Sequence, residues 1–343
     1  MNKSNNMPKR KKIIDDDDDD DDDSNYFKIE DYKITNLESF IKMIFDLDSK
    51  DEPPRKIRIK LPVNIYKLIN ILEPLIKLNN LIGMNKLKEQ LLEQLLYFIQ
   101  GHGDIVMLHT VIEGPPGTGK TTIANLMAEI YSGIGILKKN KCTIIKRQDL
   151  IGQYLGETTI KTMNALNRCK NGVMLIDEAY SLGSGSGNSV DSYAKEAIDC
   201  INQYLTENVD KLICIIAGYK YELDKCFFSQ NPGLRRRFPW TFTIEDFKEN
   251  ELSHVMLKMI RESDWDTDCD FKKIESLIKK NYFSGNGGDI ETIISRAKII
   301  YSRVNFGKEN DFTLTYDILK EAFQNFYDTK KIVDDSPPSM MYT

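Results

Sequence analysis

The segment GPPGTGKT, residues 114–121, constrains the fold of this chain more than any other stretch. It satisfies the pattern G-x-x-x-x-G-K-[ST], follows the apolar run IVMLHTVIE and opens the helical run TTIANLMAEIY. Glycines between a strand and a helix let backbone N–H groups close around phosphates, at a helix N-terminus that favours anions. We call this segment the phosphate loop; the alternative is a glycine-rich turn without a ligand.

Two side chains of the phosphate loop carry specific predictions. Lys120 is expected to reach the β- and γ-phosphates of a nucleotide, and the Thr121 hydroxyl to bind Mg²⁺. The predicted nucleotide contacts of this segment are Pro116, Gly117, Thr118, Gly119, Lys120, Thr121 and Thr122.

A second motif, VMLIDE at residues 173–178, is an apolar run that ends in two adjacent carboxylates. Asp177 is expected to hold the magnesium ion through a water molecule, and Glu178 to polarise the attacking water as the general base. The alternative is a pair of solvated acids at a strand end.

A third motif, NPGLRRRF at residues 231–238, places three consecutive arginines beside the last predicted strand. An arginine at this place can approach the γ-phosphate bound by a neighbouring subunit, as an arginine finger does. Otherwise the three arginines form a solvated basic cluster.

Short apolar runs alternate with longer helical stretches through the middle of the chain. Runs of this length and β-branched content predict an α/β fold, in which helices flank both faces of a buried, five-stranded parallel sheet. The predicted strands are 105–113, 142–146, 172–177, 211–218 and 240–244. After about residue 247, four helical patterns without a comparable strand predict a small all-α domain.

Composition and pattern together divide the chain into five parts. The predicted parts are a disordered charged tail (1–25), a helical N-terminal segment (26–80), a large α/β nucleotide-binding domain (81–246), a small helical domain (247–328) and a C-terminal tail (329–343).

In their order along the chain, seven stretches resemble AAA+ ATPases of the CbbX/SpoVK-type branch. They are LIGMNKLKEQ, EGPPGTGKTTIA, GQYLGETTIKT, GVMLIDEAYSL, KEAIDCINQYL, IIAGY and NPGLRRRF, and the small helical domain resembles the family's lid more loosely. The resemblance implies that the chain binds ATP and Mg²⁺ and hydrolyses ATP. It further implies a homo-oligomeric ring, usually a hexamer, that remodels a protein client or threads it through a central pore.

The same resemblance assigns the loop GQYLGETT to the central channel, where matching loops grip substrate polypeptide. The predicted pore loop is Gln153, Tyr154, Leu155 and Gly156. Gly152 and Gly156 would let the loop bend. Alternatively, Tyr154 packs locally under the helix that begins near Glu157.

Further site residues also follow from the resemblance. Ile82 and Gly83 lie where the family contacts adenine, and Arg235 and Arg237 match its two finger arginines. The glycine- and serine-rich segment 181–189 matches a second channel loop, or it is a passive connector.

Two departures from the family pattern concern how the nucleotide is sensed. After the fourth predicted strand the chain reads AGY where a polar sensor is common, so Tyr219 or its neighbours must position the water. The lid motif GNAR reads GNGG at residues 285–288, which puts Gly288 where the sensor arginine would stand. Unless Arg296, eight residues later, substitutes, one phosphate contact from the lid is missing.

Charge is concentrated at the N-terminus. Five basic residues and nine aspartates within residues 1–23 account for −4 of the net charge of −5, and the remaining chain is nearly neutral. A near-neutral body gives little support for a nucleic-acid partner. The cluster PKRKK at residues 8–12 is a nuclear import signal or a chance basic cluster. Because no apolar run reaches about 18 residues, we expect a soluble intracellular protein, cytoplasmic or nuclear, without a membrane partner.

The six cysteines and three histidines lack the spacing of metal ligands, which predicts neither a disulfide framework nor a zinc site. Two functions from other classes stay open. One is a nucleic-acid loader or helicase. The other is a nucleotide-gated scaffold that hydrolyses little ATP, which the missing lid arginine favours.

Overall fold

The computed structural model describes residues 26–27, 29–48, 56–57, 65–101, 107–154, 156–183, 191–209, 211–309 and 311–334. The predictions for residues 1–25, for Leu155, for most of 181–189 and for the end of the C-terminal tail lie outside the described residues.

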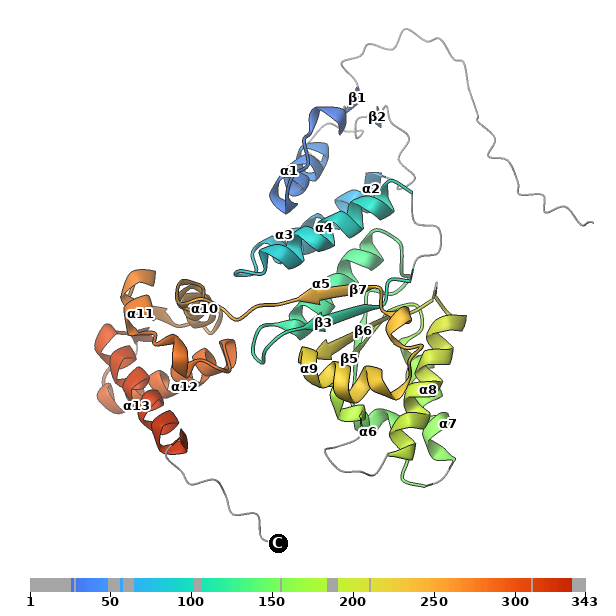
Figure 1. Ribbon diagram of the computed structural model, residues 1–343. Coiled ribbons are helices and arrows are strands. Elements are labelled where there is room, and N and C mark those ends of the chain that lie inside the picture. Colours follow the sequence, from blue (N-terminus) through green and yellow to red (C-terminus); the bar gives the residue numbers. More distant parts are fainter. Residues whose placement is uncertain are drawn as a thin grey trace, which may run out of the picture.

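A five-stranded parallel sheet forms the centre of the molecule, as predicted (Figure 1). Its spatial order is β4-β5-β6-β3-β7. The strands are β3 (Thr110–Glu113), β4 (Cys142–Ile145), β5 (Val173–Ile176), β6 (Ile213–Gly218) and β7 (Trp240–Thr243). Glu113, the last residue of β3, pairs in register with Gly218 and Thr243. The phosphate loop therefore leaves the sheet from an interior strand, between β6 and β7.

Side chains of the strands alternate between two hydrophobic cores. Ile112 and Leu175 enter one core, whereas Val111 and Ile176 enter another. Successive residues of a strand point to opposite faces, so strands without polar residues require helices on both faces. The first core contains residues of α1 (Leu37–Asp48), α2 (Ile65–Ile69), α3 (Leu72–Asn79), α4 (Asn85–Ile99) and α5 (Lys120–Gly133). The second contains residues of α6 (Arg147–Leu150), α7 (Glu157–Cys169), α8 (Ser192–Glu207) and the turns η3 (Ala179–Leu182), η4 (Leu223–Phe227) and η5 (Phe228–Gln230).

The N-terminal helices share the first core with the sheet. Phe40 of α1 and Leu75 of α3 are buried in the same cluster as Ile112 of β3. Tyr131 of α5 donates a hydrogen bond of 2.6 Å to Oε1 of Gln94 on α4, and both side chains are buried. These helices therefore support α5, the helix that the phosphate loop opens. Two short elements precede α1 in the chain, the strand β1 (Tyr26–Phe27) and the turn η2 (Ile29–Asp31). The strand β2 (Lys56–Ile57) lies between α1 and α2 in the chain and pairs with β1 in parallel.

The region after β7 is helical and has a hydrophobic core of its own. Its elements are α10 (Glu249–Glu262), α11 (Phe271–Leu277), η7 (Lys280–Tyr282), α12 (Gly287–Val304) and α13 (Tyr316–Asp334). The four predicted helices are present. A short parallel pair, β8 (Asp266–Thr267) with β9 (Thr313–Leu314), joins them, so the region is not strictly all-α. Two residues per strand are too few to show the alternation that marks a strand in a sequence.

Among the described helices, none is both long and apolar enough to cross a membrane.

Candidate functional site

The phosphate loop adopts a conformation that its glycines permit. Gly117 and Gly119 have φ angles of 69° and 84°, in the left-handed region that residues other than glycine rarely occupy. The loop folds around Lys120, whose Nζ donates to the carbonyl oxygens of Gly114 at 3.0 Å and Pro115 at 2.8 Å. The ammonium thus lies inside the loop, at the start of α5.

The structure brings the hydroxyl and the carboxylate of the predicted magnesium site together. Oγ1 of Thr121, on α5, lies 3.5 Å from Oδ2 of Asp177, which follows β5. The backbone N–H of Glu178 donates to Oδ1 of Asp177 at 3.1 Å, and Glu178 itself has a φ of 53°. A hydroxyl facing a carboxylate is an oxygen donor set that suits Mg²⁺, which keeps several waters and is completed by substrate phosphates. Among the described residues, no group of three or more His, Cys, Asp and Glu forms a separate metal cluster.

Burial shifts the protonation equilibria of this site. It lowers the pKa of the Lys120 ammonium, while Glu178 and Asp177 oppose the shift. Burial also raises the pKa of Glu178, with Asp177 adding to the increase and Lys120 opposing it. A carboxylate with a raised pKa accepts a proton more readily, as a general base must.

Tyr219 occupies the position where a polar sensor was expected. It follows β6 and precedes the short helix α9 (Lys220–Glu222), and its ring stacks on Tyr180 with centroids 5.6 Å apart. Nζ of Lys120 lies 5.5 Å from the centroid of the Tyr219 ring. The structure therefore places Tyr219 beside the lysine of the phosphate loop.

A cavity of about 240 Å³ adjoins the phosphate loop on the side of the C-terminal helical region. It is lined by Leu81, Ile82, Met84, Gly117, Thr118, Gly119, Thr122, Phe247, Val255, Lys258, Met259, Glu262 and Gly287. Ile82 thus lines a cavity beside the phosphate loop. Gly83 does not line this cavity: with a φ of 68°, it lies against Glu251, whose Oε1 would be 2.7 Å from an added Cβ.

The predicted finger arginines lie in the turn η6 (Arg235–Arg237) and contact their own chain. The guanidinium of Arg235 is 3.4 Å from Asp224 and 3.9 Å from the buried Glu113, and it lies over the ring of Phe228 at 4.4 Å. Nε of Arg237 donates to Oγ1 of Thr206 at the end of α8, at 2.9 Å. These contacts order the arginines within the chain. The contacts with Glu113 and Thr206 could not be read from the sequence, because these two partners are remote in the chain.

The predicted pore loop projects from the start of α7. Tyr154 is 69% exposed, so it does not pack under the helix in this subunit. Oε2 of Glu157 accepts hydrogen bonds from the backbone N–H groups of Gln153 at 3.1 Å and Tyr154 at 3.2 Å, and Gly156 has a φ of 84°. Glu157 is thus a brace that the sequence analysis did not identify, although an acidic residue in a first helical turn is the signal for one.

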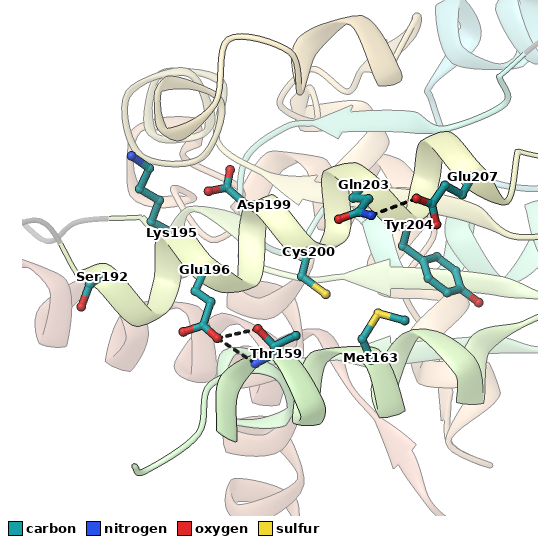
Figure 2. A pocket seen from close by; sticks show the side chains of 10 residues that line it. All are labelled: Thr159, Met163, Ser192, Lys195, Glu196, Asp199, Cys200, Gln203, Tyr204 and Glu207. Carbon is teal, nitrogen blue, oxygen red and sulfur yellow. Dashed lines mark hydrogen bonds between the residues drawn. The ribbon is translucent and has the colours of Figure 1, made fainter. Parts of the chain in front are cut away.

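A second cavity, of about 610 Å³, lies between α7 and α8 and is remote in sequence from the phosphate loop (Figure 2). At one end Glu196 of α8 accepts hydrogen bonds from the backbone and the hydroxyl of Thr159 on α7, and at the other Gln203 donates to Glu207 (Figure 2). Nothing in the sequence indicated this groove. Through Thr159, α8 is connected to α7, the helix that follows the loop of Tyr154.

In the C-terminal helical region, the structure separates the two residues considered for the missing sensor. Gly288 is exposed, and an added Cβ would have no atom within 4 Å. The guanidinium of Arg296 donates to Oγ1 of Thr329 on α13 at 3.1 Å and lies 5.9 Å from the centroid of the Phe326 ring. Arg296 therefore faces α13, and the structure gives no support to its substitution for the sensor arginine.

Comparison with known proteins identifies the family. The model of the ATPase family associated with various cellular activities (AAA) matches residues 110–242. A putative cfxQ-like protein of Acanthamoeba polyphaga mimivirus is 35% identical over 288 residues, which are 82% of this chain and 70% of that protein. Stage V sporulation protein K of Bacillus subtilis is 37% identical over 158 residues, which are 46% of this chain and 48% of that protein. The chloroplastic cbbX homolog of Guillardia theta is 29% identical over 236 residues, or 66% of this chain and 62% of that protein.

The fold also resembles the solved AAA domain of FIGL-1 in complex with ADP. The TM-score is 0.52 at 19% sequence identity, and the match covers 72% of this chain and 83% of that one. At this identity the likeness concerns the fold alone. The sequence relationships go further, and they show that this chain belongs to the AAA ATPases, in the branch of CfxQ/CbbX and stage V sporulation protein K.

Proposed function

We propose that this chain is an ATP-hydrolysing ring motor that remodels a protein client or threads it through a central pore. The AAA domain implies ATPase activity in general, and AAA proteins often form rings. The observation that supports the finer proposal is Tyr154, which is 69% exposed on a loop that Glu157 holds in place. An exposed aromatic side chain on a braced loop can pack against a polypeptide that passes it.

The proposed chemistry assigns one task to each group at the nucleotide. ATP would supply the phosphoryl group, and a bound Mg²⁺ would neutralise the charge that develops on it. The phosphate loop orients the phosphates, and Lys120 turns from the carbonyls of Gly114 and Pro115 toward them. Thr121 and Asp177 would hold the metal, and Glu178 would take a proton from the attacking water. Tyr219 would orient that water.

Two further assignments complete the proposed site. Ile82, together with the apolar side chains of the 240 Å³ cavity, would receive the adenine. Arg235 and Arg237 would complete the site of a neighbouring subunit, where positive charge stabilises the transition state of phosphoryl transfer.

The pore-loop proposal predicts the effect of removing the Tyr154 ring. We expect a permanently unfolded polypeptide, such as reduced and carboxymethylated lactalbumin, to stimulate ATP turnover of the wild-type protein. Tyr154→Ala should abolish this stimulation, because the grip is lost. Ile299→Ala is the matched control, since Ile299 is 70% exposed but lies on α12. Steady-state ATP turnover with increasing polypeptide measures both.

The same titration separates the alternative functions. Equal stimulation of Tyr154→Ala and Ile299→Ala would reject threading through the pore loop. Stimulation by single-stranded DNA and not by the polypeptide would favour a nucleic-acid loader.

A further inference from the structure

The first turn of α12 lies directly on the phosphate loop. The backbone N–H of Gly287 donates to the carbonyl oxygen of Gly117 at 3.1 Å. A Cβ at Gly117 would lie 2.1 Å from the carbonyl oxygen of Gly285, and a Cβ at Gly287 would lie 2.7 Å from that of Gly117. The two backbones meet so closely that neither position has room for a side chain.

Asn286 connects this contact to the rest of the molecule. Its side chain is fully buried, and Nδ2 donates to the carbonyl oxygen of Pro116 at 3.3 Å and to Oδ1 of Asp246 at 2.9 Å. Oδ1 accepts from the backbone N–H of Phe247 at 3.1 Å, and Nζ of Lys280 lies 3.5 Å from it. One side chain therefore joins the phosphate loop, the segment between β7 and α10, and the C-terminal helical region.

The backbone at Asn286 is held in a sparsely populated conformation, with a φ of 48° and a ψ of −117°. Such a conformation costs free energy, on the order of 1–3 kcal/mol, and persists only where the surrounding contacts determine it. Here the partners on both sides of Asn286 supply those contacts.

We propose that Pro116, Gly117, Asn286 and Gly287 form a latch, through which the conformation of the phosphate loop sets the position of the C-terminal helical region. Asn286 is a positioning residue, because it acts on the phosphate loop through the carbonyl of Pro116. The latch takes the place of a contact from position 288, a glycine where an added Cβ would meet no atom within 4 Å, and from Arg296, which faces α13. The inference rests on the proposed nucleotide site.

Two adjacent glycines offer a matched test. Gly287 and Gly288 both lie in the first turn of α12, and neither has a φ in the left-handed region. Alanine at either position therefore changes helix propensity equally. At position 287 the added Cβ meets the carbonyl of Gly117, whereas at position 288 it meets nothing within 4 Å.

The measurement is made on the full chain with Glu178→Gln, which stops turnover during the titration. ATP affinity is measured by calorimetry, and amide hydrogen exchange of residues 285–290 is followed with and without ATP. We expect Gly287→Ala to lower the affinity for ATP about tenfold, within the range of roughly 5- to 150-fold typical of coupled sites. It should also remove the protection that ATP gives these amides, and Gly288→Ala should leave both quantities unchanged.

A second pair of variants covers the case in which Gly287→Ala fails to fold. Asn286→Asp removes the donor to Pro116 and faces Asp246 with a like charge, which Asp246→Asn relieves in the double variant. We expect the double variant to fold and still to lose the ATP-dependent protection. Full protection in the double variant, or equal behaviour of Gly287→Ala and Gly288→Ala, would overturn the latch alone. Failure of the Glu178→Gln chain to bind ATP would overturn the nucleotide site and the latch together.

Discussion

His109, the residue before β3, illustrates how burial fixes the state of a single group. It is fully buried, its Nδ1 accepts a hydrogen bond of 3.1 Å from the backbone N–H of Cys214 on β6, and its ring lies 5.9 Å from that of Phe238. Burial lowers the pKa of His109 from 6.5 to about 4. The folded protein therefore keeps this imidazole neutral at a pH where an unfolded chain would protonate it.

This pKa shift predicts a loss of stability in mild acid. The imidazole of His109 takes up a proton near pH 6.5 in the unfolded chain and only near pH 4 in the folded chain. Its contribution to the free energy of unfolding is therefore complete above pH 6.5 and disappears as the pH falls toward 4. Within that window the free energy of unfolding should fall by about 1.4 kcal/mol per pH unit through this group. Urea denaturation from pH 7 to pH 5 measures the slope.

Two variants isolate the contribution of His109. His109→Asn keeps an acceptor for the N–H of Cys214 and does not titrate, so its slope should be shallower than that of the wild type. His254→Asn is the control, because His254 is exposed and stacks on Phe271. If the free energy of unfolding fell with pH equally in the wild type and in His109→Asn, the pH dependence would not come from His109.

At the scale of elements, α3 is part of the core under the nucleotide site. Leu75 of α3 is fully buried in the cluster that includes Ile112 of β3, whereas the next residue, Ile76, is 39% exposed. Leu75→Ala should lower the free energy of unfolding by about 2–5 kcal/mol, because it removes packed methyl groups and leaves a cavity. Ile76→Ala should lower the free energy of unfolding much less. Equal effects on chemical denaturation would show that α3 does not share the core of the sheet.

Elements with a local signal were predictable from the sequence, and those fixed by distant partners were not. The apolar runs predicted all five strands of the central sheet, and the phosphate loop and the acids after β5 were found through their spacing. The packing of α1 and α3 on the sheet had no such signal, because an amphipathic helix does not show which surface covers it. Asn286 and Glu113 were missed for the same reason, since their partners lie far away in the chain.

At the scale of the whole molecule, the role proposed for the arginines of η6 requires a second subunit. Arg235 and Arg237 are ordered by their own chain, but the proposed site they complete belongs to a neighbour. ATP turnover per subunit should therefore rise with protein concentration, and Glu178→Gln should reduce it to background at every concentration. Turnover measured across a wide dilution series tests this.

The two other outcomes of that dilution series are also informative. A constant turnover per subunit above background would show that a single chain contains a complete site. A wild-type rate that stays at the Glu178→Gln background throughout would favour the nucleotide-gated scaffold.

The strand order also affects how the chain folds during its synthesis. β3 ends at Glu113, but its two neighbours in the sheet are β6, which begins at Ile213, and β7, which begins at Trp240. Pairing between such distant segments closes long loops and is slow. On the ribosome, β3 stays without either neighbour until most of the chain has emerged, so its apolar edges are open to aggregation throughout that time. The strand that presents the phosphate loop is thus among the last to be enclosed, and a nascent chain acquires its nucleotide site only near the end of synthesis.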